Sequence, residues 1–194
     1  TDATVLIQGE SGTGKELVAR AIHNLSPRNG QPFVVINCAA IPSTLMESEV
    51  FGHIRGAFTG AVRTNMGRLE IANRGIVFLD DIDTLDVSMQ AKLLRVIQEK
   101  EFERLGSTKV IKIDVRFIAA SNRDLSDLIS RGEFREDLFY RLNVFPIKLP
   151  PLRERRGDIP LLLDHFMDLN AKTTGKPPKR FSGRAIKILT EYDW

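Results

Sequence analysis

TVLIQGESGTGK, residues 4–15, predicts a buried strand, a glycine-rich turn and the start of a helix. The apolar and β-branched run before the turn is typical of a strand buried on both faces. The turn has the spacing G-x-x-x-x-G-K, which places backbone N–H groups, the positive end of a helix dipole and a lysine around phosphate oxygens. Its seven residues are Gly9, Glu10, Ser11, Gly12, Thr13, Gly14 and Lys15. A glycine-rich turn with a surface lysine is the weaker alternative, so we expect a phosphate-binding loop with Lys15 at the β- and γ-phosphates of a nucleotide.

Two acids, Asp80 and Asp81, directly follow another apolar run, residues 76–79. This is the geometry of a Walker B element, in which the first carboxylate binds Mg²⁺ and the second orients or deprotonates the attacking water. A pair of solvated acids at a strand end is common in isolation. It is the weaker interpretation here because a phosphate-binding loop precedes it. Asp80 is therefore the predicted metal ligand and Asp81 the predicted catalytic acid.

Short apolar runs alternate with amphipathic segments, a pattern that predicts an α/β domain with a mostly parallel sheet. The predicted strands span residues 4–7, 33–36, 76–79, 116–120 and 144–147. The last should lie at a sheet edge because Pro146 lacks a ladder donor. Helices are predicted at about residues 15–24 and on the face marked by Met89, Leu93, Val96 and Ile97. Residues 102–112 alternate around Gly106-Ser107 as a hairpin does.

The character of the chain changes after Pro150-Pro151. Residues 160–170 have helical periodicity, residues 173–179 form a predicted Gly/Pro/Lys loop, and Ser182 is a candidate cap for a further helix. We therefore predict an α/β core over residues 1–150 and the start of a helical subdomain over residues 151–194.

The composition fits a globular protein with a mixed surface. Its 28 basic and 25 acidic residues give a net charge of +3, which weakens the case for direct nucleic-acid binding. The single cysteine, Cys38, excludes an internal disulfide and fits a reducing compartment. The histidines lack metal-ligand spacing. Neither a membrane-spanning apolar stretch nor a signal peptide is found, so we expect a cytoplasmic protein with no membrane partner.

A separate six-residue stretch carries an aromatic and a hydroxyl residue between small residues. Its members are Gly56, Ala57, Phe58, Thr59, Gly60 and Ala61. Glycine at both ends permits positive φ and sharp turns, so the Phe58-Thr59 pair can be presented at a tip. A large apolar side chain there is costly in water unless a partner receives it. On these letters alone, a buried hairpin with Phe58 in the core is an equal alternative.

Together these motifs resemble the central domain of sigma-54-dependent transcription activators, a branch of the AAA+ ATPases also called bacterial enhancer-binding proteins. The resemblance rests on GESGTGKE (9–16), GAFTGA (56–61), Asp80-Asp81 and LPPLRER (149–155), and it runs from Val5 to Trp194. It implies an AAA+ P-loop core with a five-stranded parallel sheet, a partial helical lid, ATP and Mg²⁺ as ligands, and a ring of six or seven subunits. It also implies that residues 9–16 and Asp80 bind the nucleotide and that residues 56–61 contact the sigma-54 RNA polymerase holoenzyme.

The resemblance assigns roles to four further residues. Asn122 resembles the sensor I residue at the γ-phosphate or attacking water, and Asn37 resembles the residue that restrains the Walker B acid. Each is alternatively an ordinary strand-end cap. Arg135 and Arg141 match arginine fingers that enter the neighbouring subunit's nucleotide site. Surface pairing with Glu133, Glu136 or Asp137 is the alternative for these arginines.

The sequence departs from the family pattern at two site positions. Glu16 stands where a P-loop usually has Ser or Thr, although GESGTGKE is itself typical of the family. Asp81 stands where the family has Glu, which shortens the acid by a methylene. We also expect this chain to be a core fragment that lacks the sensor II segment and the N-terminal adenine-binding residues.

Three functions follow as hypotheses. The first is an ATPase that remodels the sigma-54 holoenzyme through the GAFTGA loop. The second is a nucleotide-gated binding module with weak or no turnover because Asp81 is short. The third, direct DNA binding, is disfavoured by the modest net charge, so we expect DNA to be bound only through a separate domain outside this chain.

Overall fold

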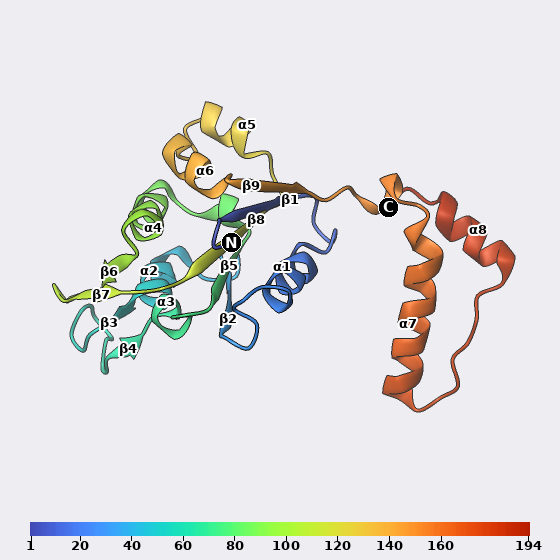
Figure 1. The fold of residues 1–194 in the computed structure, drawn as a ribbon, viewed down its shortest axis with the longest axis horizontal. Coiled ribbons are helices and arrows are strands. Elements are labelled where there is room, and N and C mark those ends of the chain that lie inside the picture. Colours follow the sequence, from blue (N-terminus) through green and yellow to red (C-terminus); the bar gives the residue numbers. More distant parts are fainter. The chain divides into compact units, whose positions relative to one another are not determined.

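The computed structural model describes all 194 residues, which form two compact units. The first unit spans Thr1–Leu149 and the second Pro150–Trp194. Figure 1 shows the larger unit as an α/β body and the smaller one as a pair of helices. Each unit is described separately below.

A five-stranded sheet forms the centre of the first unit, with the strand order β2-β5-β8-β1-β9 and every pair parallel. The strands are β1 Val5–Gln8, β2 Phe33–Asn37, β5 Ile76–Asp80, β8 Arg116–Ser121 and β9 Phe145–Lys148. The predicted parallel five-stranded sheet is confirmed, with strand boundaries shifted by at most one residue. β9 lies at an edge, as the missing N–H of Pro146 predicts.

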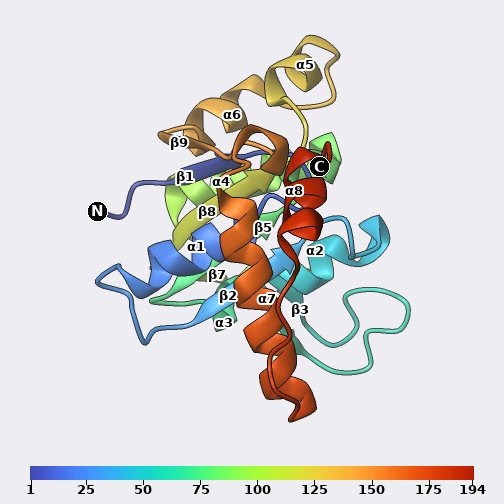
Figure 2. The same ribbon diagram turned by 90° about the vertical axis from the view of Figure 1, so that its right-hand side faces the viewer.

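Helices cover both faces of this sheet (Figures 1 and 2). α1, Lys15–Asn24, packs Ala19 against the face that carries Ile7, Phe78 and Ile118. The opposite face packs against the larger hydrophobic cluster, to which the other helices of the unit contribute. These helices are α2 Ser43–Phe51, α3 Arg68–Ile71, α4 Val87–Glu99, α5 Leu125–Ser130 and α6 Glu136–Leu142, with a 3₁₀ turn at Ile82–Thr84.

The predicted apolar face of α4 is confirmed, because Met89, Leu93, Val96 and Ile97 are all buried. Asp86 caps this helix by accepting a hydrogen bond from the backbone N–H of Met89 at 2.8 Å. The carboxylate satisfies one of the N–H groups that a helix start leaves open. A helix with a capped N-terminus thus begins at Val87, soon after β5 ends at Asp80.

Two small antiparallel sheets lie outside the main sheet. β3 (Gly52–His53) pairs with β4 (Asn65–Met66), and the residues between them include the GAFTGA stretch. β6 (Glu101–Glu103) pairs with β7 (Val110–Lys112), which confirms the hairpin predicted around Gly106-Ser107. The GAFTGA stretch is therefore an insertion between α2 and α3 rather than part of the core.

The second unit contains a 3₁₀ turn at Leu152–Glu154, α7 at Asp158–Thr174 and α8 at Gly183–Glu191. Ser182 caps α8 as predicted, accepting from the N–H of Ala185 at 3.3 Å. The predicted loop from residue 173 begins too early. α7 instead continues to Thr174 and ends at Gly175, where φ is 66°. Within this last turn the hydroxyls of Thr173 and Thr174 donate to the carbonyls of Leu169 and Asn170.

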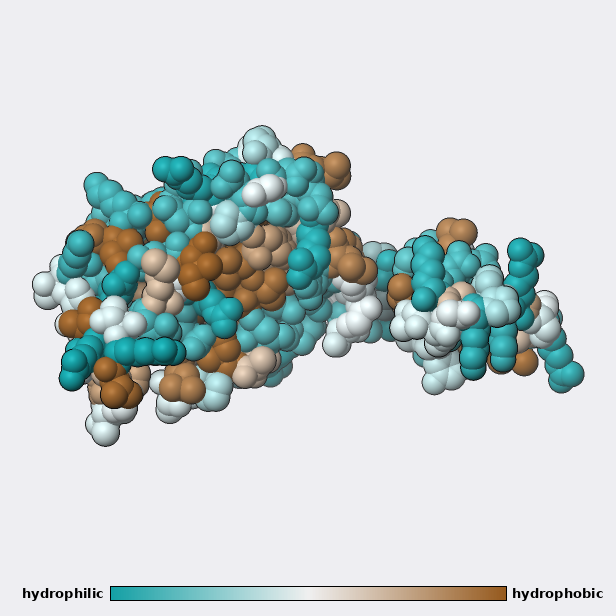
Figure 3. Space-filling model, turned by 90° about the horizontal axis from the view of Figure 1, so that it is seen from below, coloured by the Kyte–Doolittle hydropathy of each residue, from teal (hydrophilic) through white to brown (hydrophobic).

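Hydrophobic side chains are exposed on both units (Figure 3). In the second unit they come from both helices and from the segments beside α8. None of the helices is both long enough and apolar enough to cross a membrane.

Candidate functional site

The phosphate-binding loop connects β1 to α1, as the sequence predicts. Gly12 and Gly14 have φ of 81° and 98°, in the left-handed region that glycine enters without a steric penalty. Gly14 occupies the N-cap position of α1, and no side chain caps this helix. The open N–H groups of the first turn and the positive dipole end thus lie beside a loop with little side-chain bulk, which fits a bound phosphate.

Lys15 lies inside this loop, with only 8% of its surface exposed. Its ammonium donates hydrogen bonds to the carbonyl oxygens of Gly9 at 2.9 Å and Glu10 at 3.1 Å. The hydroxyl of Thr13 also donates to the Glu10 carbonyl, at 2.8 Å. The Lys15 ammonium therefore lies in the space inside the loop. When a nucleotide enters, the ammonium has to exchange the two carbonyl oxygens for phosphate oxygens.

Glu16, at the usual Ser/Thr position, turns toward the next turn of its own helix. Its carboxylate accepts two hydrogen bonds from Arg20, at 2.7 and 2.9 Å. This is an exposed i,i+4 pair, which contributes only about 0.3–0.5 kcal/mol to stability. Glu16 thus lies at the loop, but its carboxylate pairs with Arg20.

Asp81 and Asn122 are brought together by the order of the strands. They follow β5 and β8, which are neighbours in the sheet. The Asn122 amide donates to Asp81 Oδ1 at 3.1 Å, and the backbone N–H of Gly9 donates to the Ser121 carbonyl at 3.2 Å. The phosphate-binding loop, the second acid and the candidate sensor therefore meet at the carboxyl ends of three adjacent strands, where ligands bind in open α/β sheets.

The two acids differ in backbone and environment. Asp81 has φ 52° and ψ 47°, a left-handed conformation that is uncommon for a residue with a side chain. Its N–H donates to Asp80 Oδ1 at 3.2 Å. Partial burial, and then the negative charge of Asp81, raise the pKa of Asp80, while Lys15 acts in the opposite direction. Asp80 thus carries a carboxylate whose negative charge a cation would stabilise.

Asp80 suits Mg²⁺ because this ion usually takes one or two protein carboxylates and completes its shell with phosphate oxygens and water. A single acid at the end of β5, next to a phosphate-binding loop, is compatible with that requirement. Glu16 contributes no free carboxylate, since it pairs with Arg20.

Asn37 is opposite Asp80 in the register of β2 and β5. Its side-chain oxygen accepts a hydrogen bond from the N–H of Ala40 at 2.9 Å, so in this conformation it caps the turn after its own strand. The amide lies at the same sheet end as the acids but makes no hydrogen bond with either.

Cys38 supports the same sheet end through its backbone. Its N–H donates to the Asp80 carbonyl at 2.9 Å, and its thiol is buried. Burial, with added repulsion from the nearby carboxylates, raises the pKa of Cys38 to about 12. This matches a small buried hydrophobe better than a reactive thiol.

We expect the native protein to resist thiol alkylation. At pH 8 a thiol with a pKa of about 12 is ionised to only about one part in ten thousand, so iodoacetamide should react about a thousandfold more slowly than with an ordinary cysteine. Mass spectrometry of timed reactions measures this, and the urea-unfolded chain is the control. Equal rates in the native and unfolded protein would contradict the burial of Cys38.

Two buried polar side chains that the sequence did not single out hold the sheet end together. The Ser121 hydroxyl donates to Asp83 Oδ1 at 2.9 Å, and both residues are buried. Ser121 directly precedes Asn122, and Asp83 lies two positions after Asp81. Their contact therefore fixes the turn after β5 against the end of β8. Only the strand order reveals this pairing.

Arg135 and Arg141 lie at opposite ends of α6, where Arg135 is half-buried and Arg141 is exposed. Arg135 makes an ion pair with Asp137, with distances of 2.6 and 3.0 Å, which lowers the pKa of Asp137. Arg141 makes no ion pair or hydrogen bond within the chain. The surface pairing considered from the sequence thus occurs at Arg135, and Arg141 leaves its guanidinium available.

The GAFTGA stretch forms a compact loop whose tip is exposed. Gly56 and Gly60 have φ of 82° and 101°, as their predicted role in turning the chain requires. The Gly56 N–H donates to the Ala61 carbonyl at 2.9 Å, and the Ala61 N–H donates to the Phe58 carbonyl at 3.0 Å. Phe58 remains 39% exposed and belongs to neither hydrophobic cluster. The alternative of a Phe58 packed into the core is therefore wrong for this structure.

One ring contact holds Phe58 near the surface. Its ring meets the edge of His53 at a centroid distance of 5.0 Å and an angle of 66°. His53 Nδ1 in turn lies 2.8 Å from the Ser48 hydroxyl of α2. An exposed aromatic edge contact of this kind is weak enough to be exchanged for a partner's surface.

The base of the loop is tied to the β6–β7 hairpin. The Ile54 N–H donates to the Leu105 carbonyl at 3.1 Å, and the Leu105 N–H donates to the Gly52 carbonyl at 3.0 Å. A Cβ on Gly106 would lie 2.8 Å from that of Ala57, so this close approach requires glycine. The loop therefore has a fixed base and an exposed tip.

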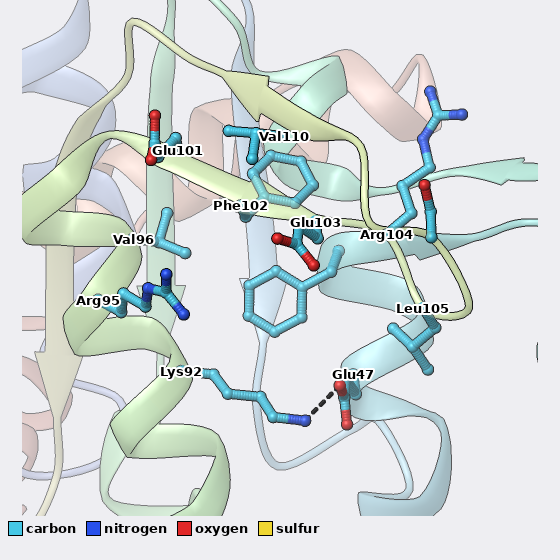
Figure 4. Close-up of a pocket in the computed structure, with 12 residues that line it drawn as sticks. Glu47, Lys92, Arg95, Val96, Glu101, Phe102, Glu103, Arg104, Leu105 and Val110 are labelled. Carbon is cyan, nitrogen blue, oxygen red and sulfur yellow. Dashed lines mark hydrogen bonds and ion pairs between the residues drawn. The ribbon is translucent and has the colours of Figure 1, made fainter.

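A pocket of about 260 Å³ lies beside this base, between α2, α4 and the β6–β7 hairpin (Figure 4). Phe51 and Phe102 form part of its apolar wall, with ring centroids 5.8 Å apart, and Lys92 pairs with Glu47 at its mouth. None of the predicted site residues lines it. The loop between β1 and α1 has the phosphate-binding geometry that this pocket lacks.

Comparison with known proteins identifies the family of the chain. Residues 1–148 match the family described as the sigma-54 interaction domain, and residues 153–194 match the AAA+ ATPase lid domain. The chain belongs to the sigma-54 interaction domain family. It is thus the AAA+ central domain of a sigma-54-dependent activator, with an α/β P-loop core and a short helical lid region.

Similar proteins support this family assignment. The chain is 56% identical over 194 residues to the DNA-binding transcriptional activator HyfR of Escherichia coli K12, covering all of this chain and 29% of that protein. It is 60% identical over 167 residues to a Nif-specific regulatory protein of Bradyrhizobium diazoefficiens, covering 86% of this chain and 29% of the relative. The chain therefore spans about three-tenths of the length of these curated relatives.

Solved structures give the same fold. NtrX from Brucella abortus in complex with ADP matches with a TM-score of 0.93 and 42% identity, over all of this chain and 42% of NtrX. The P-loop NTPase domain of an E. coli sigma-54 transport activator matches with a TM-score of 0.51 and 18% identity, over 78% of this chain and 86% of that domain. The second match supports the fold alone.

Proposed function

We propose that this chain is the ATP-hydrolysing part of a transcription activator that remodels the sigma-54 RNA polymerase holoenzyme. The convergence of Lys15, Asp81 and Asn122 at one sheet end is the observation that carries the proposal. The named activators among its relatives support the biological class, and NtrX structures in complex with ADP and with ATP support a nucleotide ligand.

Each site residue has a chemical task in this proposal. Residues 9–16 surround the phosphates with backbone N–H groups, and Lys15 neutralises the β- and γ-phosphates. Mg²⁺, held through Asp80, would neutralise charge that develops on the transferred phosphoryl group. Asp81 orients the attacking water and accepts its proton. Asn122 holds the Asp81 carboxylate in place by the hydrogen bond at 3.1 Å.

The remaining residues connect hydrolysis to a second subunit and to the polymerase. Arg135 and Arg141 are permanently charged and reach the surface, as groups that enter a neighbouring subunit's site must. A ring of six or seven subunits would place them there. Asn37 would shift between its cap on Ala40 and the acids as the nucleotide state changes. The GAFTGA tip, Phe58 and Thr59, would then be raised toward sigma-54.

Open-complex formation at a sigma-54 promoter tests this proposal. We expect the full-length protein with ATP and Mg²⁺ to convert closed complexes to open ones, as detected by permanganate reactivity of unpaired thymines. Replacing ATP with a non-hydrolysable analogue should abolish the conversion because the loop would not complete its cycle. Equal opening with the analogue, or none with ATP, would contradict the proposal.

A nucleotide-gated module with slow turnover is the second candidate, and one observation favours it. Asp81 is a methylene shorter than the family's glutamate, and its carboxylate is already engaged by Asn122. A misplacement of about 1 Å can lower a rate about a hundredfold. Tight nucleotide binding without phosphate release would support this function over the ATPase.

Asp81→Glu separates the two candidates. If reach limits hydrolysis, the variant should accelerate single-turnover ATP cleavage, by up to about a hundredfold. Rapid-quench measurements with protein in excess over ATP report that step alone, and Asp81→Asn is the matched control that removes the base. A slower Asp81→Glu variant would show that Asp81 is already well placed.

A further inference from the structure

Gln90 is a completely buried amide in α4, at 0% exposure, and it takes no part in the site described above. Its Nε2 donates hydrogen bonds to the Leu85 carbonyl at 2.8 Å and to the Glu133 carbonyl at 2.9 Å. Its Oε1 accepts from the backbone N–H of Arg135 at 2.8 Å. A buried amide is costly unless its groups are paired, and here both ends of the amide are.

These three bonds join two functional segments that are far apart in the sequence. Leu85 ends the short turn that follows Asp81, and Arg135 is the residue that precedes α6. The Arg135 side chain makes only one short-range pair, with Asp137. Gln90 therefore holds the backbone N–H of Arg135, whose carbonyl accepts from the Phe139 N–H at 3.1 Å, while the guanidinium pairs only with Asp137 at the surface.

Only an amide of this length satisfies all three groups. A carboxylate at this position would accept from Arg135 but would repel the two carbonyl oxygens, and a thioether would pair with none of them. The requirement for glutamine is thus set by two carbonyls and one N–H from separate segments. It does not come from helix propensity or from packing alone.

We propose that Gln90 is a positioning residue for Arg135, holding the backbone of the arginine that acts on a neighbouring subunit in a fixed place relative to the Asp81 turn of its own subunit. The inference rests on the proposed function, since it presupposes that Arg135 assists hydrolysis in the next subunit. Gln90 acts through Arg135 and does not touch the nucleotide.

A double-mutant cycle on steady-state ATP hydrolysis by the full-length protein tests this inference. We expect Gln90→Met to lower kcat about tenfold or more and to leave KM for ATP within about twofold, because the subunit's own phosphate loop is intact. In the Arg135→Ala background the same substitution should have no further effect. Gln98→Met, at an exposed position of the same helix, is the matched control and should behave as the unmodified protein.

Assemblies mixed from two variants provide a second test. Recovery of ATP hydrolysis on mixing is not expected if Gln90 only stabilises its own subunit. Lys15→Ala subunits have an impaired nucleotide site but an intact Arg135, so they can serve the sites of Gln90→Met subunits. Neither variant alone should hydrolyse ATP at the normal rate, and mixing them should restore part of the activity. Arg135→Ala mixed with Lys15→Ala is the positive control.

The outcomes separate this inference from the function on which it rests. Normal hydrolysis by Arg135→Ala would contradict the role proposed for that arginine. A slow Arg135→Ala protein combined with additive effects in the cycle, or with no recovery on mixing, would overturn the Gln90 inference alone. If Gln90→Met does not fold, Gln90→Asn carries the same comparisons, because its shorter amide cannot reach all three partners. If thermal unfolding shows that neither variant folds, Gln90 serves global stability and the inference is overturned.

Discussion

Lys15→Ala should lower ATP hydrolysis at least about a hundredfold and weaken nucleotide binding, because the ammonium is the one positive side chain enclosed by the phosphate loop. In this structure the ammonium donates to the Gly9 and Glu10 carbonyls. Those oxygens would repel phosphate if no cation lay between them. The loss should therefore exceed that from removing an exposed charge. Fluorescent-nucleotide titration and phosphate release measure the two effects.

Lys112→Ala is the matched control for charge and residue type. Lys112 is exposed on β7 and makes no ion pair, so its loss should leave both measurements unchanged. Circular dichroism should show that both variants keep the fold. Hydrolysis by folded Lys15→Ala at the rate of Lys112→Ala would contradict the assignment of the loop.

The parallel sheet was predictable because each strand is a short apolar run with a clear boundary. Residues 76–79 and 116–120 are buried on both faces, and residues 33–36 at the sheet edge are at least partly buried, so their sequences contain little except apolar side chains. The boundaries shifted by one residue where a polar residue, such as Gln8 or Ser121, still pairs in the ladder. The hydrophobic pattern of a sequence predicts which part of a strand is buried, but it does not predict the residue at which the ladder of hydrogen bonds ends.

The short helices were missed for local reasons. α2 starts after Pro42 without a side-chain cap, and its buried residues do not keep to one narrow stripe. α3 is a single turn at Arg68–Ile71, too short for periodicity to register. Their positions are determined by packing on the sheet, which no local pattern reports.

The site was predictable residue by residue but not as an arrangement. The phosphate loop is contiguous in sequence, so its spacing already describes its chemistry. The Asn122–Asp81 hydrogen bond depends on β5 and β8 being neighbours, which is a property of strand order. Gln90 was missed because its partner Arg135 is 45 positions away and nothing near Gln90 in the sequence signals a buried amide.

Phe58→Ala and Thr59→Ala should each abolish activation from a sigma-54 promoter while leaving ATP binding intact. Both residues are exposed at the tip, and the Thr59 hydroxyl makes no hydrogen bond within the chain. Phe58 makes one edge contact with His53, which it can exchange for a partner's apolar surface. Truncation of a central anchor in an interface typically costs about 2–4 kcal/mol, or about 30- to 1,000-fold in affinity.

Val62→Ala distinguishes the tip from general exposure of apolar surface. Val62 is 83% exposed and lies just past the six-residue stretch, so its truncation removes apolar area without altering the tip. We expect Val62→Ala to activate transcription normally and all three variants to bind nucleotide equally, since the P-loop belongs to a different segment. Transcripts counted from a reporter promoter in cells with matched protein levels give the comparison. Normal activation by either tip variant would refute the contact with sigma-54, because Phe58 and Thr59 are the exposed side chains between Gly56 and Gly60.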